Sequence, residues 1–342
     1  MTEPAALKSP KWVTMQDVAR MAGVSTITVS RALRMPDKVK APTRERIDAA
    51  IRALGYVPDQ IAGSLSSRES RLVAALVSTM AGSIFASTVD GLAQALREQG
   101  HQLLLGTTEY SSESEEQLIA TALSRRPDGL VLTSGEHTPA ARQMLAHAAV
   151  PVVEVWDLPE QPIDMAVGFS NHEAGRAMTR FLFDTGRRRI GFVGAMQEGD
   201  RRGRLRLMGY EAALGELGLG APRSVADAGI ASMVERGARN FVELMQRWPD
   251  TDAIFCASDS VALGAVSEAR RRGFAVPEQL AIAGLGDFDF AGEHGLALTT
   301  VRIPGYAIGA EAGRMIIRRK QGDQDTPKSV DVGFEIVRRG SA

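Results

Sequence analysis

The stretch TMQDVARMAGVSTITVSRAL, residues 14–33, predicts two short amphipathic helices separated by a tight turn. Thr14 is expected to cap the first helix, with Asp17 three residues later in a variant capping box. Gly23 suits the turn, because glycine adopts a positive φ at the least cost. Ser25 is expected to cap the second helix. The spacing therefore predicts a helix-turn-helix unit.

The second helix, Thr26–Leu33, is expected to present different faces to the core and to solvent. Val29 and Leu33 are expected to point inward. The residues left on the outward face are Thr26, Ile27, Ser30 and Arg31. A third helix, Thr43–Leu54, is expected to end at Gly55.

From about residue 71 onward, short apolar runs alternate with amphipathic helices. The expected strands are Leu72–Val77, His101–Leu105, Gly129–Thr133 and Val152–Val155, and the expected helices are Phe85–Gln99, Ser114–Ser124 and Pro139–Ala148. Alternation at this spacing predicts a parallel sheet with helices on both faces.

The same cycle restarts in the second half of the body. The expected helices are Ala174–Thr185, Arg206–Leu217 and Val261–Arg272, and the expected strands are Arg189–Gly194, Ala253–Cys256 and Leu280–Leu285. Two similar α/β lobes are therefore expected, with a small-ligand cleft between them at the carboxyl ends of the strands. The expected domains are a headpiece at 1–58, a hinge at 59–70 and a body at 71–342, whose lobes comprise about 71–169 plus 302–329 and about 170–301 plus 330–342.

Composition favours a globular protein of a reducing compartment. The net charge is −1, but residues 1–70 hold 11 basic and 7 acidic side chains, which hints at a polyanionic partner and fits ordinary surface scatter equally well. The single Cys256 excludes an internal disulfide and a Cys-cluster zinc site. The N-terminus has no apolar core of a secretory signal, and the longest apolar run, Leu72–Val77, is far shorter than the ~20 residues of a membrane span. A cytoplasmic protein without membrane contact is expected.

The sequence lacks the motifs of several enzyme classes. No lysine lies between residues 41 and 319, which removes a Schiff-base lysine and a GxxxxGK[ST] phosphate loop from the body. The five histidines never form HExxH or HxH, and no GxSxG is present. Gly284-Leu285-Gly286 begins like a dinucleotide fingerprint but lacks the third glycine. Neither catalysis, nor a cofactor, nor a metal is expected.

The chain resembles the LacI family of bacterial repressors over nearly its full length. Residues 14–33 and RERIDAAIRALGYVPDQIAGSL, residues 44–65, are similar to the headpiece and hinge of that family. The landmarks in the body are DGLVLTS, RRRIGFVGA, RLRLMGYEAAL, DAIFCASDSVALGA and LALTTVRIP. Within the family, VVEVWD, AVGFSNHEAG and the EHT at 136–138 look most like the gluconate-utilisation repressor group. The resemblance implies a body like that of periplasmic binding proteins, with two parallel, doubly wound sheets, and a repressor that binds operator DNA as a homodimer or higher oligomer.

The resemblance also implies which headpiece residues contact DNA. Its recognition helix enters the major groove, where Thr26, Ile27 and Arg31 face the base edges. Arginine can bind guanine bidentately, and isoleucine can pack on thymine methyl groups. The expected phosphate anchors are Thr14, Ser25, Thr28, Ser30, Lys38 and Arg44. For Thr28 and Ser30 the alternative is ordinary solvation on the helix surface.

The hinge helix of the family enters the minor groove. Leu65 occupies the position where the family wedges an apolar side chain between base steps. A segment as short as Asp59–Ser67 is not helical in isolation, so DNA and dimer contacts must order it. Asp59 stands where relatives commonly have asparagine, and a carboxylate near phosphate weakens non-specific affinity.

Candidate ligand-binding residues lie at strand ends and at the helix starts that follow them. They are Ser83, Phe85, His137, Thr138, Glu154, Trp156, Asp157, Phe169, Arg202, Arg206, Ser258 and Asp287. Aromatic rings can cover sugar C–H faces, and carboxylates can accept from hydroxyls. By resemblance, Arg206 is the effector-binding arginine, and a guanidinium binds a carboxylate bidentately. The expected effector is a small sugar acid, such as gluconate or a keto-gluconate.

Other interpretations of these residues stay open. His137 also fits a solvated loop, Asp259 fits an N-cap of the helix after it, and Arg187–Arg189 fits a solvated strand entry. Gly286 and Gly305 stand where better-known relatives have an aspartate and a phenylalanine, so the pocket is not a copy of a galactoside site. A transport protein that binds a sugar is the alternative function, against which the headpiece and the missing signal argue.

Overall fold

The structure, a computed structural model, describes residues 12–57, 70–80, 84–133, 135–194, 200–226, 232–293 and 295–342. It divides into two compact units, Met1–Arg68 and Glu69–Ala342, which we call the headpiece and the body. Most of the expected hinge, including Leu65, lies outside the described residues, as does Ser83.

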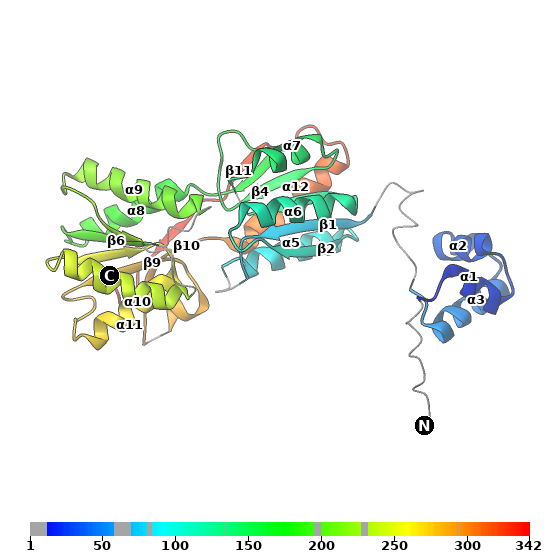
Figure 1. The fold of residues 1–342 in the computed structure, drawn as a ribbon, viewed down its shortest axis with the longest axis horizontal. Helices are drawn as coiled ribbons and strands as arrows, with labels where there is room; N and C mark the ends of the chain where they lie inside the picture. The colour runs from blue at the N-terminus through cyan, green and yellow to red at the C-terminus, as the bar shows by residue number, and fades with distance from the viewer. Residues whose placement is uncertain are drawn as a thin grey trace, which may run out of the picture. The chain divides into compact units, whose positions relative to one another are not determined.

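The headpiece consists of short helices around a small core (Figure 1). Its helices are α1 (Met15–Ala22), α2 (Thr26–Arg34), the 3-10 helix η1 (Pro36–Lys38) and α3 (Ala41–Leu54). The predicted caps are confirmed: Thr14 and Asp17 form a reciprocal capping box, Ser25 caps α2, and Gly23 lies in the turn at φ +64°. Val18, Val29 and Ile47 are fully buried at the centre. Capping and apolar spacing thus give the predicted helix-turn-helix.

Two details of the headpiece differ from expectation. Leu33 was expected to be buried but is 36% exposed, and Ala32 is buried in its place. The inward-facing residues Val29 and Ala32 are therefore three residues apart, and not four. The third helix begins at Ala41 rather than Thr43, since Pro42 fits its first turn without losing an intrahelical hydrogen bond.

The first lobe of the body, lobe 1, is a six-stranded parallel sheet between two layers of helices (Figure 1). Its strands run in the order β11 (Ser329–Asp331), β5 (Met165–Gly168), β4 (Val152–Val155), β3 (Gly129–Leu132), β1 (Leu72–Val77) and β2 (Gln102–Thr107). Alternate residues of β1 point to opposite faces. Val73 packs in one core with α5 (Ala86–Glu98) and α12 (Gly305–Lys320), and Ala74 packs in another with α6 (Ser112–Ser124) and α7 (Pro139–His147).

The second lobe, lobe 2, repeats this plan. Its strand order is β12 (Glu335–Val337), β10 (Thr299–Arg302), β9 (Ala281–Gly286), β8 (Ala253–Cys256), β6 (Ile190–Gly194) and β7 (Arg223–Ala226). Its helices are α8 (Asn171–Asp184), α9 (Arg201–Leu217), α10 (Met233–Arg247), α11 (Asp259–Arg271) and the 3-10 helix η2 (Asp289–Gly292). Only β12 is antiparallel to its neighbour among the described strands. The predicted α/β class with two parallel-dominated sheets is confirmed.

The described chain crosses between the lobes after β5, after β10 and after β11. The last crossing comes later than the expected boundary at residue 330, because β11 pairs with β5 and the Val332 amide donates to the Gly168 carbonyl at 2.9 Å. These crossings place the ends of both sheets against one another.

Glycines allow α8 and α9 to cross at very close range. A Cβ atom on Gly209 would lie 1.9 Å from the His172 carbonyl oxygen, and one on Gly175 would lie 2.2 Å from the Arg206 carbonyl oxygen. Both contacts are with backbone, so no side-chain rearrangement could accommodate a methyl group. The close crossing therefore fixes the position of Arg206 relative to α8.

Among the described residues, no helix has the length and apolar character that a bilayer span requires.

Candidate functional site

The outward face of α2 carries the side chains predicted to contact bases. Ile27 is 69% exposed although it is a large apolar residue, and Arg31 is exposed on the same helix. Thr26 and Ser30 are half-buried. An exposed isoleucine beside an exposed arginine on a nine-residue helix suits contact with base edges.

The predicted phosphate anchors lie around the helix starts. Ser25 Oγ accepts from the Thr28 amide at 3.2 Å and lies 2.9 Å from Thr28 Oγ1. Thr14 Oγ1 donates to Asp17 Oδ2 at 2.6 Å. Lys38 is exposed at the end of η1, and Arg44 is half-buried in the first turn of α3. The hydroxyls thus have a capping role, and contact with phosphate stays a prediction.

An aromatic row lies at the lobe boundary. The Phe85 and Trp156 ring centroids are 5.2 Å apart and edge-on, and Phe169 follows Trp156 at 6.0 Å. All three rings are buried. Trp156 Nε1 donates to Thr88 Oγ1 at 2.9 Å, and its backbone has φ +72°. The structure therefore brings together the three aromatic residues predicted to bind the ligand.

Arg202 links the two lobes beside this row. From α9 it donates to the Thr133 carbonyl at 2.5 Å and to Ser78 Oγ at 3.2 Å, at the ends of β3 and β1. Its guanidinium carbon lies 5.1 Å from the Phe85 ring centroid, within cation–π range. The carboxyl ends of lobe 1 strands thus meet the first turns of α9.

Arg206 is a buried cation with unused hydrogen-bonding capacity. It is 7% exposed, and Nη1 donates to Asn171 Oδ1 at 3.3 Å. Its Nε has no hydrogen-bond partner in the described part of the chain. Burial lowers the pKa of Arg206, while the charge of Asp200 raises it. A buried, incompletely paired guanidinium is costly unless an anion completes it.

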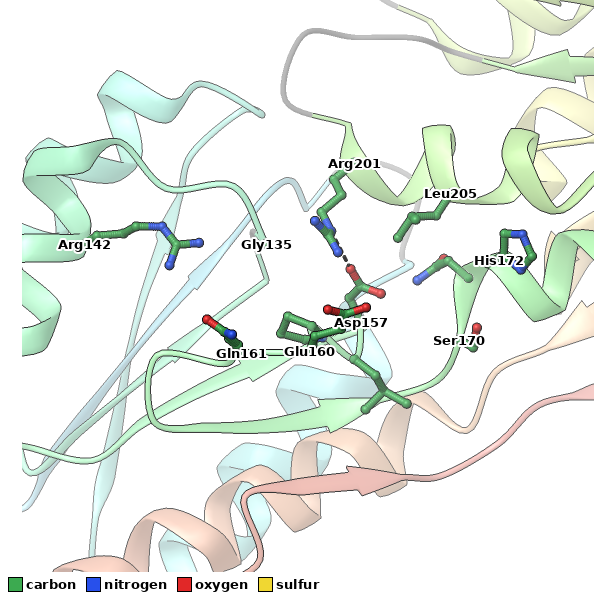
Figure 2. A pocket seen from close by; sticks show the side chains of 12 residues that line it. Gly135, Arg142, Asp157, Glu160, Gln161, Ser170, His172, Arg201 and Leu205 are labelled. Carbon is green, nitrogen blue, oxygen red and sulfur yellow. Dashed lines mark hydrogen bonds and ion pairs between the residues drawn. The ribbon is translucent and has the colours of Figure 1, made fainter.

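Asp157 lies on the wall of a pocket of about 440 Å³ (Figure 2). Arg201 Nε donates to Asp157 Oδ2 at 3.0 Å across the lobes. The pocket is lined from lobe 1 by Arg142 and residues 157–161, and from lobe 2 by the starts of α8 and α9. Of the predicted ligand-binding residues that are described, Asp157 alone lines it.

His137 and Glu154 are occupied within lobe 1. The imidazole is fully buried, with Nδ1 at 2.8 Å from Glu115 Oε2 and Nε2 at 3.4 Å from Glu154 Oε1. Burial alone lowers the pKa of His137, but the hydrogen bonds with Glu115 and Glu154 raise it to about 9. The interpretation of His137 as a solvated loop residue is therefore wrong.

Glu154 and Thr138 have further partners in the same lobe. Glu154 Oε2 accepts from the Ile163 amide at 2.7 Å. Thr138 caps α7, accepting from the Ala141 amide, and donates to Glu116 Oε2 at 2.5 Å. Ligand contact by these side chains, and by His137, stays a prediction that the geometry does not favour.

The last two candidates also have protein partners. Ser258 Oγ caps α11 by accepting from the Val261 amide at 3.4 Å. Asp287 accepts from Arg302 Nε and Arg339 Nη2, each at 2.6 Å. Their ligand contacts are untested, and their bonds within lobe 2 are sufficient to explain both side chains.

Two sequence interpretations nearby are corrected. Asp259 is not the cap of α11 but its first residue; it is fully buried and accepts from the Phe288 amide at 2.9 Å and Thr300 Oγ1 at 2.5 Å. Arg187 is not simply solvated, since it donates to the carbonyls of Asp252, Pro277 and Glu278.

Sequence reasoning missed Asn171 and Tyr110. Asn171 is fully buried and connects Arg206 to the Trp156 carbonyl, to which its Nδ2 donates at 2.9 Å. Tyr110 is placed near Arg202 and Arg206 by the loop after β2; burial raises its pKa, and Arg202 lowers it. The strand-end rule applied to β2, as it was to its neighbours, points to Tyr110.

Comparison with known proteins gives the same two-part organisation. Residues 14–59 match the model of the bacterial regulatory proteins of the lacI family, and residues 179–342 match the periplasmic binding protein-like domain. The HTH-type transcriptional regulator GntR of Pseudomonas aeruginosa is 37% identical over 328 residues, covering 96% of this chain and 95% of that protein.

Solved structures extend the similarity over almost the whole chain. A LacI-family transcriptional regulator from Silicibacter pomeroyi has a TM-score of 0.89 at 32% identity, covering 96% of this chain and 99% of that one. The transcriptional regulator CelR in complex with cellobiose has a TM-score of 0.70 at 31% identity, covering 96% of this chain and 100% of that one.

Proposed function

The chain belongs to the LacI family of bacterial regulatory proteins, a family of DNA-binding transcriptional regulators and not of enzymes. On this premise we propose that it represses a carbohydrate-utilisation operon in the cytoplasm. A small sugar acid such as gluconate or a keto-gluconate releases it from its operator. It binds the operator as a homodimer, through base contacts by Thr26, Ile27 and Arg31.

The burial and incomplete pairing of Arg206 are the observation that supports a sugar acid as the ligand. Its guanidinium is buried against Asn171, whose amide donates to the Trp156 carbonyl, and its Nε lacks a partner among the described residues. A ligand carboxylate would supply the missing acceptor by a charge-assisted hydrogen bond. A neutral sugar offers only hydroxyl oxygens, which accept more weakly.

The neighbouring groups suit the remainder of a polyhydroxylated acid. Phe85 and Trp156 provide apolar surface for C–H faces, and Asp157 provides acceptors for hydroxyls. CelR, a relative in fold and sequence, carries a sugar in its solved complex. These features support a carbohydrate ligand with a carboxylate end.

The test is calorimetric titration of the full chain with gluconate and, in parallel, with glucose. Gluconate is expected to bind more tightly, and to lower affinity for operator DNA in a gel-shift assay. Equal binding of the two compounds, or gluconate binding without any loss of operator affinity, contradicts the proposal.

A sugar-binding protein of transport is the second candidate function. Its two-lobed body would look alike, but the match of residues 14–59 to a DNA-binding family argues against it. Sequence-specific binding of one duplex from a random-sequence pool distinguishes the two, because only the regulator would select a site.

A further inference from the structure

One carboxylate holds the last residue of the predicted hinge and the first residue of the predicted body. Asp128, which directly precedes β3, accepts from the Ser70 amide through Oδ1 at 3.2 Å and from the Arg71 amide through Oδ2 at 2.8 Å. We propose that Asp128 is a positioning residue for operator binding, because it fixes the point at which the chain from the headpiece enters the body. The inference rests on the operator binding of the proposed function and not on its ligand.

The carboxylate of Asp128 is buried and charged. Its side chain is 5% exposed, and Lys320 Nζ donates to Oδ2 at 2.7 Å. His101 Nε2 lies 3.1 Å from the same oxygen. Burial raises the pKa of Asp128, but the hydrogen bonds from Lys320 and from the two backbone amides hold that pKa below its ordinary value. A charged acceptor binds amides about twice as strongly as a neutral one, so both amides are firmly held.

The cation that pairs with Asp128 is itself held in place. Lys320 is the last residue of α12. This helix packs against α5 with backbone against backbone, since a Cβ atom on Gly309 would lie 1.8 Å from the Thr88 carbonyl oxygen. The crossing leaves no room for a methyl group. Lys320 therefore belongs to a fixed pair of helices, and Asp128 is bonded to the frame of lobe 1.

The backbone of Arg71 needs such support. Its φ is +52°, in the left-handed region that is costly for a residue other than glycine. The Arg71 carbonyl accepts from the Gln102 amide at 2.8 Å, and Asp128 accepts from its amide. A costly conformation persists only where the surroundings hold it. Loss of Asp128 should therefore release Ser70 and Arg71, and lengthen the connection between headpiece and body by two residues that are no longer fixed.

A longer connection weakens the binding of a complete operator by the proposed homodimer. After one headpiece has bound, the effective concentration of the second falls as its connection lengthens. Each residue that is free before binding and fixed afterwards also costs conformational entropy. Release of two residues should weaken binding of the complete operator by about tenfold. Binding of a duplex that carries a single half-site should change by less than about twofold, because only one headpiece is engaged.

Asp164 provides the matched control. Like Asp128, it lies in lobe 1, accepts from a backbone amide and pairs with a cation of α12: the Val152 amide donates to Oδ2 at 3.2 Å, and Arg319 Nη2 lies 3.5 Å from Oδ1. Among the described residues it bonds to neither of the two that Asp128 holds at the entry to the body. A loss that reflects only a weakened lobe 1 should therefore appear in variants of both aspartates.

The first test is a gel-shift titration of the full chain, of Asp128→Ala and of Asp164→Ala. The probes are a duplex selected by the unmodified chain from a random-sequence pool and one half of that duplex, at a protein concentration where sedimentation shows the same oligomeric state for all three. Asp128→Ala should bind the complete duplex about tenfold more weakly, and Asp164→Ala less than about twofold. Both should bind the half-duplex like the unmodified chain.

The isosteric pair Asp128→Asn and Asp164→Asn repeats the comparison in case an alanine variant does not fold. Asparagine keeps one acceptor oxygen for the amides and loses the ion pair with Lys320. Asp128→Asn should therefore recover part of the affinity and bind the complete duplex about threefold more weakly than the unmodified chain. Asp164→Asn should show no loss.

Hydrogen exchange measures the proposed anchor directly. The Ser70 and Arg71 amides should exchange at least about tenfold faster in the Asp128 variants, with the rest of the sheet unchanged. In the Asp164 variants the Val152 amide should exchange faster instead. Unchanged exchange at Ser70 and Arg71, or faster exchange there with unchanged operator affinity, overturns the proposal.

The outcome is distinguishable from a failure of the proposed function. Gluconate is absent from these assays, so an incorrect ligand leaves their result unaffected. Equal losses in the Asp128 and Asp164 variants overturn the positioning role alone. Absence of sequence-specific binding by the unmodified chain overturns operator binding and the positioning role together.

Discussion

Arg206 donates a hydrogen bond from Nη1 to Oδ1 of Asn171 at 3.3 Å, and this contact joins the two helices of lobe 2 that reach the lobe boundary. Asn171 is held in turn by the Trp156 carbonyl of lobe 1. One buried amide thus connects the guanidinium of lobe 2 to lobe 1, so a ligand bound to Arg206, as proposed, would change the lobe arrangement.

Arg206→Ala should abolish the response to gluconate. The loss of one partner from a buried ion pair costs about 3–5 kcal/mol, so the affinity for the acid should fall by that amount. Operator affinity without ligand should stay nearly unchanged, since Arg206 lies in the body. Calorimetry with gluconate and gel shifts with and without it measure both effects. A variant that still leaves its operator on addition of gluconate would show that Arg206 does not bind the effector.

Arg31→Ala should reduce affinity for the cognate operator by about 1–3 kcal/mol and relax the preference for one base. Lys38 is exposed and is predicted to contact phosphate, so Lys38→Ala should weaken binding to all sequences alike and lower the salt slope by about one unit. Binding of a panel of single-base operator variants at several salt concentrations distinguishes the two. Equal losses on every sequence in both variants would mean that Arg31 does not contact bases.

The His137 cluster should make stability depend on pH. Hydrogen bonds to Glu115 and Glu154 overcome the effect of burial and raise the pKa of His137 to about 9, above its unfolded value of about 6.5. The native state therefore binds the proton more tightly, so this stabilisation is full below about pH 6.5 and is lost as the pH rises through about 9.

Replacement of this histidine measures the effect. His137→Gln should lower the free energy of unfolding by about 2–3 kcal/mol at pH 6 and by much less at pH 9.5. Urea denaturation of both proteins across this range is the measurement. A deficit that stays constant with pH would show that His137 is neutral in the folded protein.

Gly209→Ala should disrupt the crossing of α8 and α9. The new methyl group would meet the His172 carbonyl at 1.9 Å, so the helices must separate and Arg206 must shift. We expect a loss of stability of about 1–3 kcal/mol, as for overpacked cores, together with weaker binding of gluconate.

Gly215→Ala on the same helix is the matched control. Nothing lies within 4 Å of its Cβ position, so the better helix propensity of alanine should raise stability by up to about 1 kcal/mol. Thermal denaturation compares the two variants. Equal effects would mean that the close crossing is not what Gly209 provides.

Much of the fold follows from local patterns in the sequence. The caps at Thr14 and Ser25 and the strands at 72–77, 152–155 and 253–256 agree with the structure because apolar runs and capping residues act over a few residues. No strand was expected at β5, β7, β10, β11 or β12, each three or four residues long, because so short a segment carries no periodicity. The helices α10 and α12, of 15 and 16 residues, were not expected either, and their length does not explain this.

The candidate site was harder to predict from the sequence. The rule that ligand-binding residues follow strand ends correctly grouped Phe85, Trp156 and Arg202. The same rule could not show that Glu115 and Glu154, 22 and 17 residues from His137, would bond to its ring. Partners of this kind are set by tertiary packing of separate elements, which the sequence pattern does not reveal.

The crossings between the lobes have a consequence for how such a protein can be recombined. Each lobe is assembled from separate stretches of chain, so no single cut between residues 71 and 342 yields an intact lobe. The headpiece is one continuous stretch that ends before Glu69. A joint at this point exchanges the whole DNA-reading part and breaks neither sheet. The choice of operator and the choice of ligand are therefore separable by one fusion, and a chimaera made there inherits each from a different parent.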